Sequence, residues 1–448
     1  MGKYFGTDGI RGVANAGLGA VLATRAGLAA AIALGETGVK PKAVIGRDTR
    51  ISGDMLELAL TAGLCAGGAD VLRLGVLPTP AVAYIARKMR ADMGIVISAS
   101  HNPYEYNGIK IFNNQGMKLS DALETEIERL IDNPEELSKK AKTHDKLGAV
   151  CEDDGVGARD YVRRILPLAD GDLTSFRVAV DCANGASFET APWLFRSLGV
   201  TADFIGDSPD GTNINRGCGS TCLDALRAMA LSGGYDLCIA FDGDADRCLM
   251  IDERGGDIDG DMILAVCAKD MADRGRLKNN SVVGTIVSNS GLDAFGRDFG
   301  INILRADVGD RNVLELMRAS GANLGGETSG HTIFLDEATT GDGQLTAVKF
   351  LSIMARTGRA ASELVSDFKR FPQVIVNARV AQAEKAAKMV LAELNSAIAL
   401  AERELGCGGR ILVRPSGTES YIRVTVEAET EERARECAAA LAALIEKL

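Results

Sequence analysis

The alternation of short apolar strands with helices constrains the fold of this 448-residue chain more than any other feature. In the N-terminal part, each predicted strand is separated from the next by a helix of small and apolar residues. The predicted helices span 18–34, 54–68 and 81–90, and the predicted strands span 43–45, 70–74 and 93–97. This order is typical of an α/β layer with a largely parallel sheet, whose ligand-binding loops follow the carboxyl ends of the strands. Polar loops directly after strands are therefore the first candidates for function.

The same alternation continues in two later blocks, and a different pattern ends the chain. We predict α/β domains over residues 1–155, 156–255 and 256–370 and an α+β domain over residues 371–448. The later blocks predict strands over 177–181, 202–205, 237–241, 282–287, 302–306 and 331–335, and helices over 187–198 and 344–356. The last segment predicts a strand from Phe371, a helix over 383–404, strands over 410–414 and 421–428, and a helix over 430–446.

The charge balance limits the kinds of partner. Lys and Arg number 50 against 61 Asp and Glu, a net charge of −11, which argues against nucleic acid as the main partner. An anionic substrate would then require a local cluster of cations. The ten cysteines are scattered, several of them within apolar runs, and are expected to be buried thiols rather than disulfides. The start of the chain does not resemble a secretory signal, and no apolar run approaches a membrane span, so a cytoplasmic protein without a membrane partner is expected.

The first candidate loop follows the strand Met93–Ile97 and reads Ser98-Ala99-Ser100-His101-Asn102-Pro103. A hydroxyl at the tip of a rigid strand is well placed to carry a transferable group. Asn107-Gly108 predicts a tight turn that leads back into the apolar residues 109–112. Taken alone, this stretch favours an ordinary surface turn after a core strand over a functional loop.

The second loop follows the strand 237–241 and places Asp242, Asp244 and Asp246 at alternate positions. Three carboxylates that converge on one side of a loop suit a hard cation such as Mg²⁺. A calcium-binding EF-hand loop is disfavoured, because Arg247 stands where that loop needs glycine and both flanks read as strands. A solvated acidic turn is the remaining alternative.

Two further loops carry polar groups. Gly325–His331 joins two strands and offers Glu327, Ser329 and His331, a set suited to sugar hydroxyls or an amine, although a plain hairpin is the alternative. The last loop places Arg414, Ser416, Gly417 and Thr418 after a strand, where a guanidinium, hydroxyls and backbone N–H groups can form a phosphate nest. This is the cationic cluster that an acidic protein needs for an anionic substrate.

In combination, the four loops resemble the α-D-phosphohexomutase family over essentially the whole chain. The motifs Phe5–Gly12, Thr340–Gly343 and the Arg-Pro-Ser-Gly-Thr form of the last loop resemble the branch of that family that acts on glucosamine phosphates. Ser420-Tyr421 and Thr328 depart from the usual family pattern, which bears on fine specificity rather than on reaction type. The resemblance implies three similar α/β domains with mixed sheets and a C-terminal α+β domain, arranged around one central cleft.

The resemblance also implies a mechanism. Ser100 would be phosphorylated and would exchange its phosphate with the 6- and 1-phosphates of the sugar through a 1,6-bisphosphate, which is also the activator. One Mg²⁺ per chain would be held by Ser100 and the three aspartates. By family position, Arg11, Lys110 and Arg247 would lie near the reacting phosphate, and His101 would orient Ser100 or accept a proton. Glu327, Ser329 and His331 would hold the sugar, and Arg414, Ser416, Gly417 and Thr418 the other phosphate.

Several alternatives stay open from the sequence. Within the same family, the substrate could be a mannose or glucose phosphate. Outside it, a metal-dependent phosphatase and a non-enzymatic Ca²⁺- or sugar-binding protein use similar loops. The sequence allows a homodimer and does not decide the oligomeric state.

Overall fold

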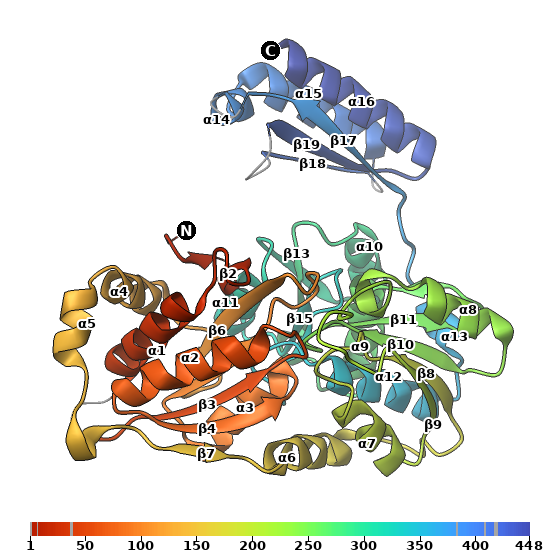
Figure 1. The fold of residues 1–448 in the computed structure, drawn as a ribbon. Coiled ribbons are helices and arrows are strands. Elements are labelled where there is room, and N and C mark those ends of the chain that lie inside the picture. Colours follow the sequence, from red (N-terminus) through yellow and green to blue (C-terminus); the bar gives the residue numbers. More distant parts are fainter. Residues whose placement is uncertain (1, 7, 36–38, 382–383, 407–408, 416–419) are drawn as a thin grey trace. The chain divides into compact units, whose positions relative to one another are not determined.

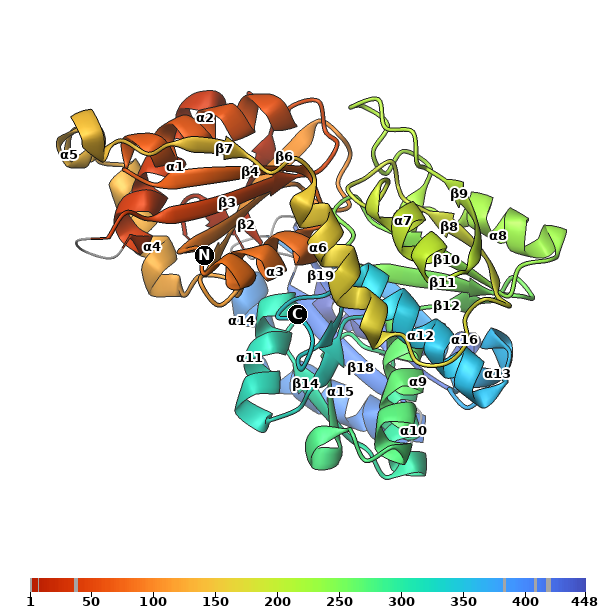
Figure 2. The same cartoon turned by 90° about the horizontal axis from the view of Figure 1, so that it is seen from below.

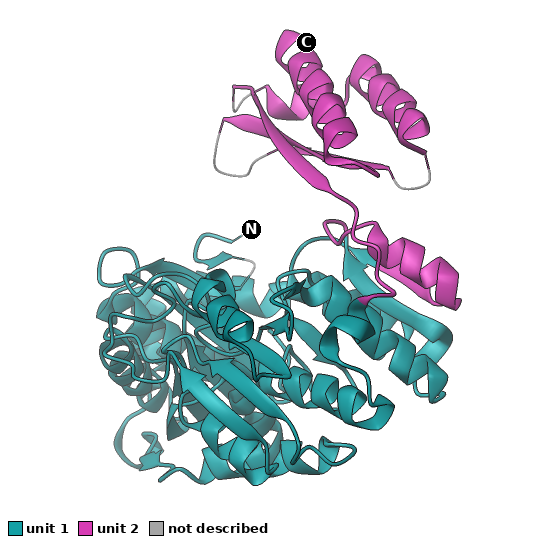
Figure 3. Ribbon diagram, turned by 90° about the vertical axis from the view of Figure 1, so that its right-hand side faces the viewer, with its two compact units in different colours: residues 1–285, 305–365 teal, residues 286–304, 366–448 magenta. Residues whose placement is uncertain are grey.

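The computed structural model describes residues 2–6, 8–35, 39–381, 384–406, 409–415 and 420–448. It divides into two compact units, which are described separately: residues 1–285 with 305–365, and residues 286–304 with 366–448 (Figure 3). The first unit holds three successive α/β blocks except for segment 286–304 of the third. The second unit holds that segment together with the C-terminal sheet and its helices.

The first block is built on a seven-stranded mixed sheet in the order β1-β2-β6-β5-β3-β4-β7 (Figure 1). Strands β3, β4, β5 and β7 pair in parallel, whereas β1, β2 and β6 pair antiparallel, so the largely parallel sheet predicted here is mixed. The strands are β1 (Phe5–Gly6), β2 (Gly9–Val13), β3 (Lys42–Arg47), β4 (Asp70–Val76), β5 (Met93–Ile97), β6 (Tyr106–Asn113) and β7 (Val150–Glu152). The helices are α1 (Ala20–Leu34), α2 (Gly53–Ala66), α3 (Thr79–Met89), α4 (Asp121–Ile131) and α5 (Pro134–Lys140).

Alternating side chains of the central strands feed two separate cores. Ile45 and Ile95 pack with α1, α2 and α4 on one face of the sheet. Val44 and Val96 pack with α3 and α6 (Val156–Ile165) on the other face. Because side chains alternate between the faces of a strand, a strand buried on both faces has to be apolar throughout. This is why β5 is buried along its whole length, as the unbroken apolar run predicted.

The second block contains a five-stranded sheet in the order β12-β11-β10-β8-β9. Its strands are β8 (Arg177–Asp181), β9 (Thr201–Ile205), β10 (Leu237–Phe241), β11 (Cys248–Asp252) and β12 (Asp257–Ile258), and its helices are α7 (Thr190–Ser197) and α8 (Asp224–Ser232). Strands β10 and β11 form an antiparallel hairpin, which carries the aspartate loop at its tip. Helix α6 contacts both α3 and α7, and so joins the first two blocks (Figure 2).

The third block pairs β13 in parallel with β15, and β15 antiparallel with β16. The elements are β13 (Ser281–Thr285), β14 (Asn302–Ala306), β15 (Leu324–Gly326), β16 (Thr332–Phe334), α9 (Gly260–Asp273), α10 (Gly291–Phe299), α11 (Asp310–Ser320), α12 (Gly343–Thr357) and α13 (Ala361–Val365). Gly326 lies opposite Thr332, so the predicted sugar loop is the connection of a short hairpin.

The C-terminal part of the second unit is an antiparallel sheet in the order β17-β19-β18 with helices packed on it. Its elements are β17 (Gln373–Arg379), α14 (Lys385–Met389), α15 (Ala392–Leu405), β18 (Arg410–Pro415), β19 (Tyr421–Glu427) and α16 (Glu431–Lys447). The single helix predicted over 383–404 is wrong. Leu391 adopts an extended backbone (φ −66°, ψ 130°), which separates α14 from α15.

The turn predicted at Asn107-Gly108 is also wrong. Both residues lie within β6, where they pair with Gly12 and Arg11 of β2. The chain reverses earlier, through hydrogen bonds from Asn102 N–H to Ala99 O and from Tyr106 N–H to Pro103 O. The glycine serves close packing, because a Cβ at position 108 would lie 2.5 Å from the carbonyl oxygen of Ser98.

The structure bears on two predictions made from composition, one about the cysteines and one about membrane-spanning helices. Nine of the ten cysteines are described and all nine are free thiols, as expected, while Cys407 lies outside the described residues. Five of the nine are buried as expected, three are partly buried, and Cys151 is exposed. No helix in the described ranges combines the length and apolarity that crossing a bilayer requires.

Candidate active site

Three loops from the three α/β blocks meet in the first unit. The serine loop follows β5, the aspartate loop joins β10 to β11, and the sugar loop joins β15 to β16. The Ser100 hydroxyl donates to Asp242 Oδ2 over 2.6 Å, which joins the first two loops. The Cys248 N–H donates to Gly330 O over 3.0 Å, which joins the second block to the sugar loop. The structure therefore brings together residues that lie more than two hundred positions apart in the sequence.

The three aspartates form a compact acidic group. Ligand oxygens of Asp242, Asp244 and Asp246 all lie within 4.8 Å of one another, and all three residues are buried. Asp244 Oδ1 and Asp246 Oδ1 have no hydrogen-bond partner among the described residues. Burial, reinforced by Asp246 and Asp244, raises the pKa of Asp242 to about 8. Unpaired buried carboxylate oxygens at this spacing fit a hard divalent cation, which would remove the repulsion between them.

Lys110 supplies a buried positive charge beside this group. Its Nζ lies 2.8 Å from Asp244 Oδ2, 3.0 Å from Asp8 Oδ2 and 3.7 Å from Asp246 Oδ2. Burial opposes its charged form, but Asp244 and Asp8 outweigh burial and hold the pKa of Lys110 well above its usual value. Thr79 also donates to Asp244 Oδ2, over 2.6 Å. Asp244 is thus oriented by two donors that both belong to the first block.

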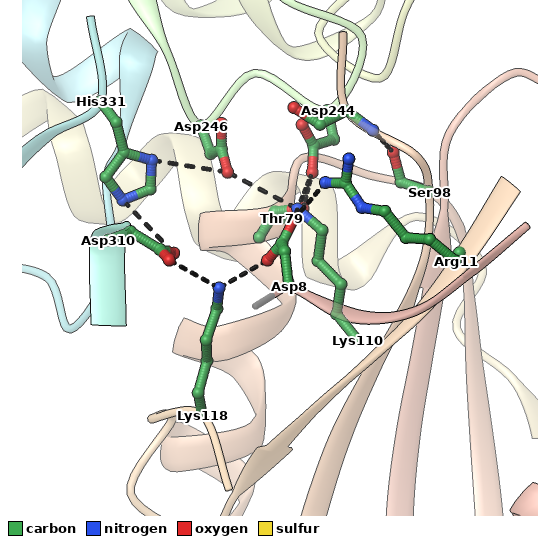
Figure 4. Close-up of polar contacts among 12 residues, drawn as sticks. Asp8, Arg11, Thr79, Ser98, Lys110, Lys118, Asp244, Asp246, Asp310 and His331 are labelled. Atoms are coloured by element: carbon green, nitrogen blue, oxygen red, sulfur yellow. Dashed lines mark hydrogen bonds and ion pairs between the residues drawn. The ribbon is translucent and has the colours of Figure 1, made fainter. Parts of the chain in front are cut away.

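A network of charges extends from the aspartates to the far side of the site (Figure 4). Lys118 Nζ lies 2.5 Å from Asp8 Oδ1 and 2.8 Å from Asp310 Oδ1. Asp310 Oδ2 lies 3.9 Å from His331 Nε2, and His331 Nδ1 lies 3.5 Å from Asp246 Oδ2. The network therefore ties the first block to the start of α11 and returns through His331 to the aspartate loop.

His331 is buried and its protonation follows from its partners. Burial opposes its charged form, yet Asp246, Asp310 and Glu327 raise the pKa of His331 to about 9. The Gly341 N–H, however, donates to His331 Nε2 over 3.0 Å, which requires a lone pair on that nitrogen. This hydrogen bond places the ring proton on Nδ1, facing Asp246, and a second proton on Nε2 would break the contact with Gly341.

A cavity of about 390 Å³ opens beside these groups. Its lining combines the guanidinium groups of Arg11 and Arg247 with the carboxylate of Glu327. His101 also lines it, and burial together with Arg247 and Arg11 lowers the pKa of His101 to about 4, so its imidazole is neutral. Glu327 Oε1 accepts from Gly309 N–H over 3.1 Å. Cations and one carboxylate around a cavity of this size suit a small molecule that carries an anionic group.

The remaining predicted residues are placed as follows. Ser329 belongs to the same hairpin as Glu327 but is not part of the cavity lining. Arg414 lies in β18 of the second unit, opposite Arg423 of β19. Ser416, Gly417 and Thr418 lie outside the described residues.

Sequence reasoning missed several residues that support the site. Asp8, Lys118 and Asp310 had no predicted role, and the last two are 192 positions apart, with no motif to connect them. Asp48 and Arg50, which hold the serine loop, were also missed. The sequence does contain a feature that could have identified Asp48 and Arg50. They lie in a polar loop directly after a strand, as the residues of the four candidate loops do.

Comparison with known proteins agrees with this fold and site. The chain belongs to the phosphoglucomutase/phosphomannomutase family, whose alpha/beta/alpha domains I, II and III match residues 2–138, 159–256 and 259–371, and whose C-terminal domain matches residues 375–444. A phosphoglucosamine mutase of Clostridium novyi (strain NT) is 49% identical over 450 residues, covering 100% of this chain and 99% of that protein.

Solved structures show the same fold. A phosphoglucomutase/phosphomannomutase family protein from Burkholderia thailandensis superposes with a TM-score of 0.82 at 25% identity, covering 98% of this chain and 97% of that one. An N-acetylphosphoglucosamine mutase of Aspergillus fumigatus, in complex with GlcNAc-6P and magnesium, has a TM-score of 0.59 at 18% identity, covering 86% of this chain and 93% of that one.

Proposed function

We propose that this chain is a phosphoglucosamine mutase, which interconverts glucosamine 6-phosphate and glucosamine 1-phosphate. The observation that carries the proposal is the 2.6 Å hydrogen bond from the Ser100 hydroxyl to one of three convergent buried aspartates. Full-length relatives at 46–49% identity carry this name. The product would supply synthesis of UDP-N-acetylglucosamine.

Phosphorylated Ser100 is the proposed donor. The bond between phosphorus and Ser100 Oγ breaks as phosphorus bonds to the free hydroxyl oxygen of the substrate, whose proton passes to a base. This yields a 1,6-bisphosphate, which turns around and returns its other phosphate to Ser100 Oγ. Neutral His101 is a candidate for the base because it follows Ser100, lines the cavity and has a lowered pKa.

A divalent cation fits this chemistry. Asp242, Asp244, Asp246 and Ser100 would hold one Mg²⁺, which supplies positive charge against the phosphate and makes phosphorus more electrophilic. A phosphate adds about −1.5 to −2 charges at neutral pH, which three buried carboxylates would otherwise repel. Lys110, Arg247 and Arg11 supply the remaining positive charge near the reacting group.

The sugar and its second phosphate need separate partners. Glu327 is proposed to pair with the ammonium group of glucosamine, with Ser329 and His331 beside it. Arg414, Ser416, Gly417 and Thr418 are proposed to hold the phosphate that does not react. These assignments require the proposed domains 1–155, 156–255, 256–370 and 371–448 to share one central cleft. The bisphosphate as activator, a cytoplasmic location and a homodimer complete the proposal.

A coupled assay with competing substrates tests this function. We expect turnover of glucosamine phosphate to exceed that of mannose or glucose phosphate, with Mg²⁺ required. Equal or better turnover of the hexose phosphates would favour a phosphomannomutase/phosphoglucomutase of the same family. Stoichiometric release of inorganic phosphate without isomerisation would instead identify a phosphatase.

A further inference from the structure

Arg50 is the largest fully buried side chain among the described residues, with an exposed fraction of 1%. It follows β3, in the loop that begins α2, and it belongs to none of the groups described above as facing the substrate cavity. Burying a guanidinium costs several kcal/mol unless it is paired and its hydrogen bonds are satisfied. A charge this deep in the protein therefore requires an explanation from its partners.

All five N–H donors of Arg50 have an acceptor. Nε donates to Asp48 Oδ2 over 2.8 Å. The remaining four donors reach backbone carbonyls of one short segment: Nη2 bonds to Ser100 O (2.9 Å) and Asn102 O (2.7 Å), and Nη1 bonds to Pro103 O (2.5 Å) and Tyr106 O (3.0 Å). The rigid fork of a guanidinium suits such a set, because its donors are fixed relative to one another. One side chain thus fixes the whole path of the serine loop from residue 100 to residue 106.

Asp48 and Ser98 complete the grip on Ser100. Asp48 Oδ2 accepts from the Ser98 hydroxyl over 2.6 Å, and Ser98 Oγ in turn accepts from the Ser100 N–H over 2.9 Å. The Ser100 carbonyl oxygen is held by Arg50 and also by Asn215 Nδ2, at 2.9 Å in each case. The N–H of Ser100 is therefore held by Ser98, and its carbonyl oxygen is held by Arg50 and Asn215.

This grip coincides with an unfavourable backbone conformation. Ser100 has φ = +52°, in the left-handed region that a serine adopts only where its surroundings outweigh the backbone strain. The hydroxyl is directed at Asp242 only while that conformation holds, because the side-chain direction follows the backbone. We propose that Arg50, Asp48 and Ser98 form a serine-loop clamp, a set of positioning residues that hold Ser100 at the angle phosphoryl transfer requires. The inference rests on the proposed function.

A second buried ion pair in the same block shows what a purely structural role looks like. Glu57, on α2, is buried and pairs with Arg73 Nη2 over 3.1 Å and with Arg47 Nε over 3.2 Å. Arg73 bonds to Glu57 and Glu152 and makes no contact with the serine loop in the described part of the chain. Arg73 is therefore a matched control for Arg50: an arginine that binds a buried carboxylate without reaching Ser100.

The test compares Arg50→Lys with Arg73→Lys. A lysine keeps the charge but cannot offer the five-donor fork. For Arg50→Lys we expect kcat per folded enzyme to fall by about 100-fold, the typical effect of a misplacement near 1 Å, with KM within about threefold of wild type. Single-turnover transfer from phosphorylated Ser100 should slow by the same factor. Arg73→Lys should lose some thermal stability, because Arg73 pairs with the buried Glu57, and should keep kcat within about twofold.

Ser98→Ala gives a second route if Arg50→Lys does not fold. It removes the acceptor for the Ser100 N–H and should lower kcat by about tenfold at unchanged KM, while Ser352→Ala, which removes a buried hydroxyl bonded to Val348 O, should not. A kcat within about threefold of wild type in Arg50→Lys or, if that variant is unfolded, in Ser98→Ala would overturn the clamp. A loss confined to KM would do the same. Failure of the proposed function is distinct, because wild-type protein itself would then show no mutase turnover.

Discussion

Two groups of buried carboxylates in the first unit differ in how completely they are compensated. Asp48 is fully buried, but its oxygens accept from Arg50 and Ser98, and Arg50 has no unused donor. Asp242, Asp244 and Asp246 are equally buried, yet two of their oxygens lack a hydrogen-bond partner among the described residues. The two groups meet at Ser100, whose backbone belongs to the first and whose hydroxyl points at the second.

This difference distinguishes carboxylates that hold the structure in place from carboxylates that take part in the reaction. A buried ion pair whose hydrogen bonds are all satisfied is stable without a further ligand. Removing one partner leaves the other charge buried and uncompensated, which destabilises the fold. A group of buried carboxylates without enough hydrogen-bond partners destabilises the fold until a cation binds. Such a group is therefore expected at a functional site. By this criterion the Asp48 group holds a position, whereas the Asp242 group has the features of a metal site.

The largest expected effect is that of Ser100→Ala, because Ser100 links the two groups. Turnover should fall by on the order of 10⁴-fold or more, as for loss of a nucleophile. The fold should persist, since the Asp48 group bonds the backbone of residue 100, which alanine retains. Circular dichroism and a mutase assay measure the two effects. Substantial turnover in this variant would contradict the phosphoserine role.

Substitution of Asp242 and Asp48 by asparagine should have opposite effects on stability. Asp242→Asn should lower kcat by about 10²–10³-fold. It should also leave the Mg²⁺-free protein as stable as wild type or more so, because asparagine is neutral and does not carry the cost of ionising a third buried carboxyl beside Asp244 and Asp246. Asp48→Asn should lower the melting temperature by several degrees, since Arg50 loses its counter-charge. Equal destabilisation by both substitutions, measured calorimetrically with chelator, would remove the distinction.

Arg414→Ala should have a smaller effect, on binding rather than on chemistry. The side chain belongs to the second unit, on β18, and is proposed to hold the non-reacting phosphate throughout the cycle. Its loss should raise KM for glucosamine phosphate by about tenfold, the value of one charge-assisted hydrogen bond, with little change in kcat. Steady-state kinetics measures both constants. A fall in kcat at constant KM would place Arg414 with the reacting group instead.

A separate expected effect, on stability rather than on turnover, is a pH dependence in the Mg²⁺-free protein. The pKa of Asp242 is about 8 in the folded state and about 3.9 in an unfolded chain, so the folded state binds more protons between these values. Stability should therefore fall as pH rises from about 4 to 8, by at most about 1.4 kcal/mol per pH unit. Thermal melts with chelator at pH 6 and pH 8 measure the slope. Asp242→Asn or added Mg²⁺ should flatten it, and a slope unaffected by both would point to other groups.

Prediction from the sequence succeeded where the signal was local. Residues 93–97, 177–181, 237–241 and 302–306 were predicted as strands and are strands with the same bounds. For 93–97 and 237–241 the reason is a continuous apolar run, which specifies a strand buried on both faces. The loops that follow these two strands hold Ser100 and the aspartates. Their convergence followed from the α/β layout, in which loops at strand ends carry ligands.

Prediction failed where distant residues decide the outcome. Asn107-Gly108 has the local signature of a turn, but pairing with β2 makes it part of a strand. Lys118 looked like any charged residue in a loop, and its role appears only when Asp310, far along the chain, lies 2.8 Å away. No local pattern marks Arg50 as buried, because its carbonyl acceptors come from a segment 50 to 56 positions later.

Intact mass spectrometry of the purified protein tests the central claim most directly. The wild-type protein, incubated with glucosamine 1,6-bisphosphate and Mg²⁺, should gain the mass of one phosphate, mapped by peptide analysis to Ser100. That phosphate should exchange with labelled phosphate from glucosamine 6-phosphate during turnover, and Ser100→Ala should acquire none. Full mutase turnover by a protein that carries no phosphate on Ser100 at any stage would contradict the account.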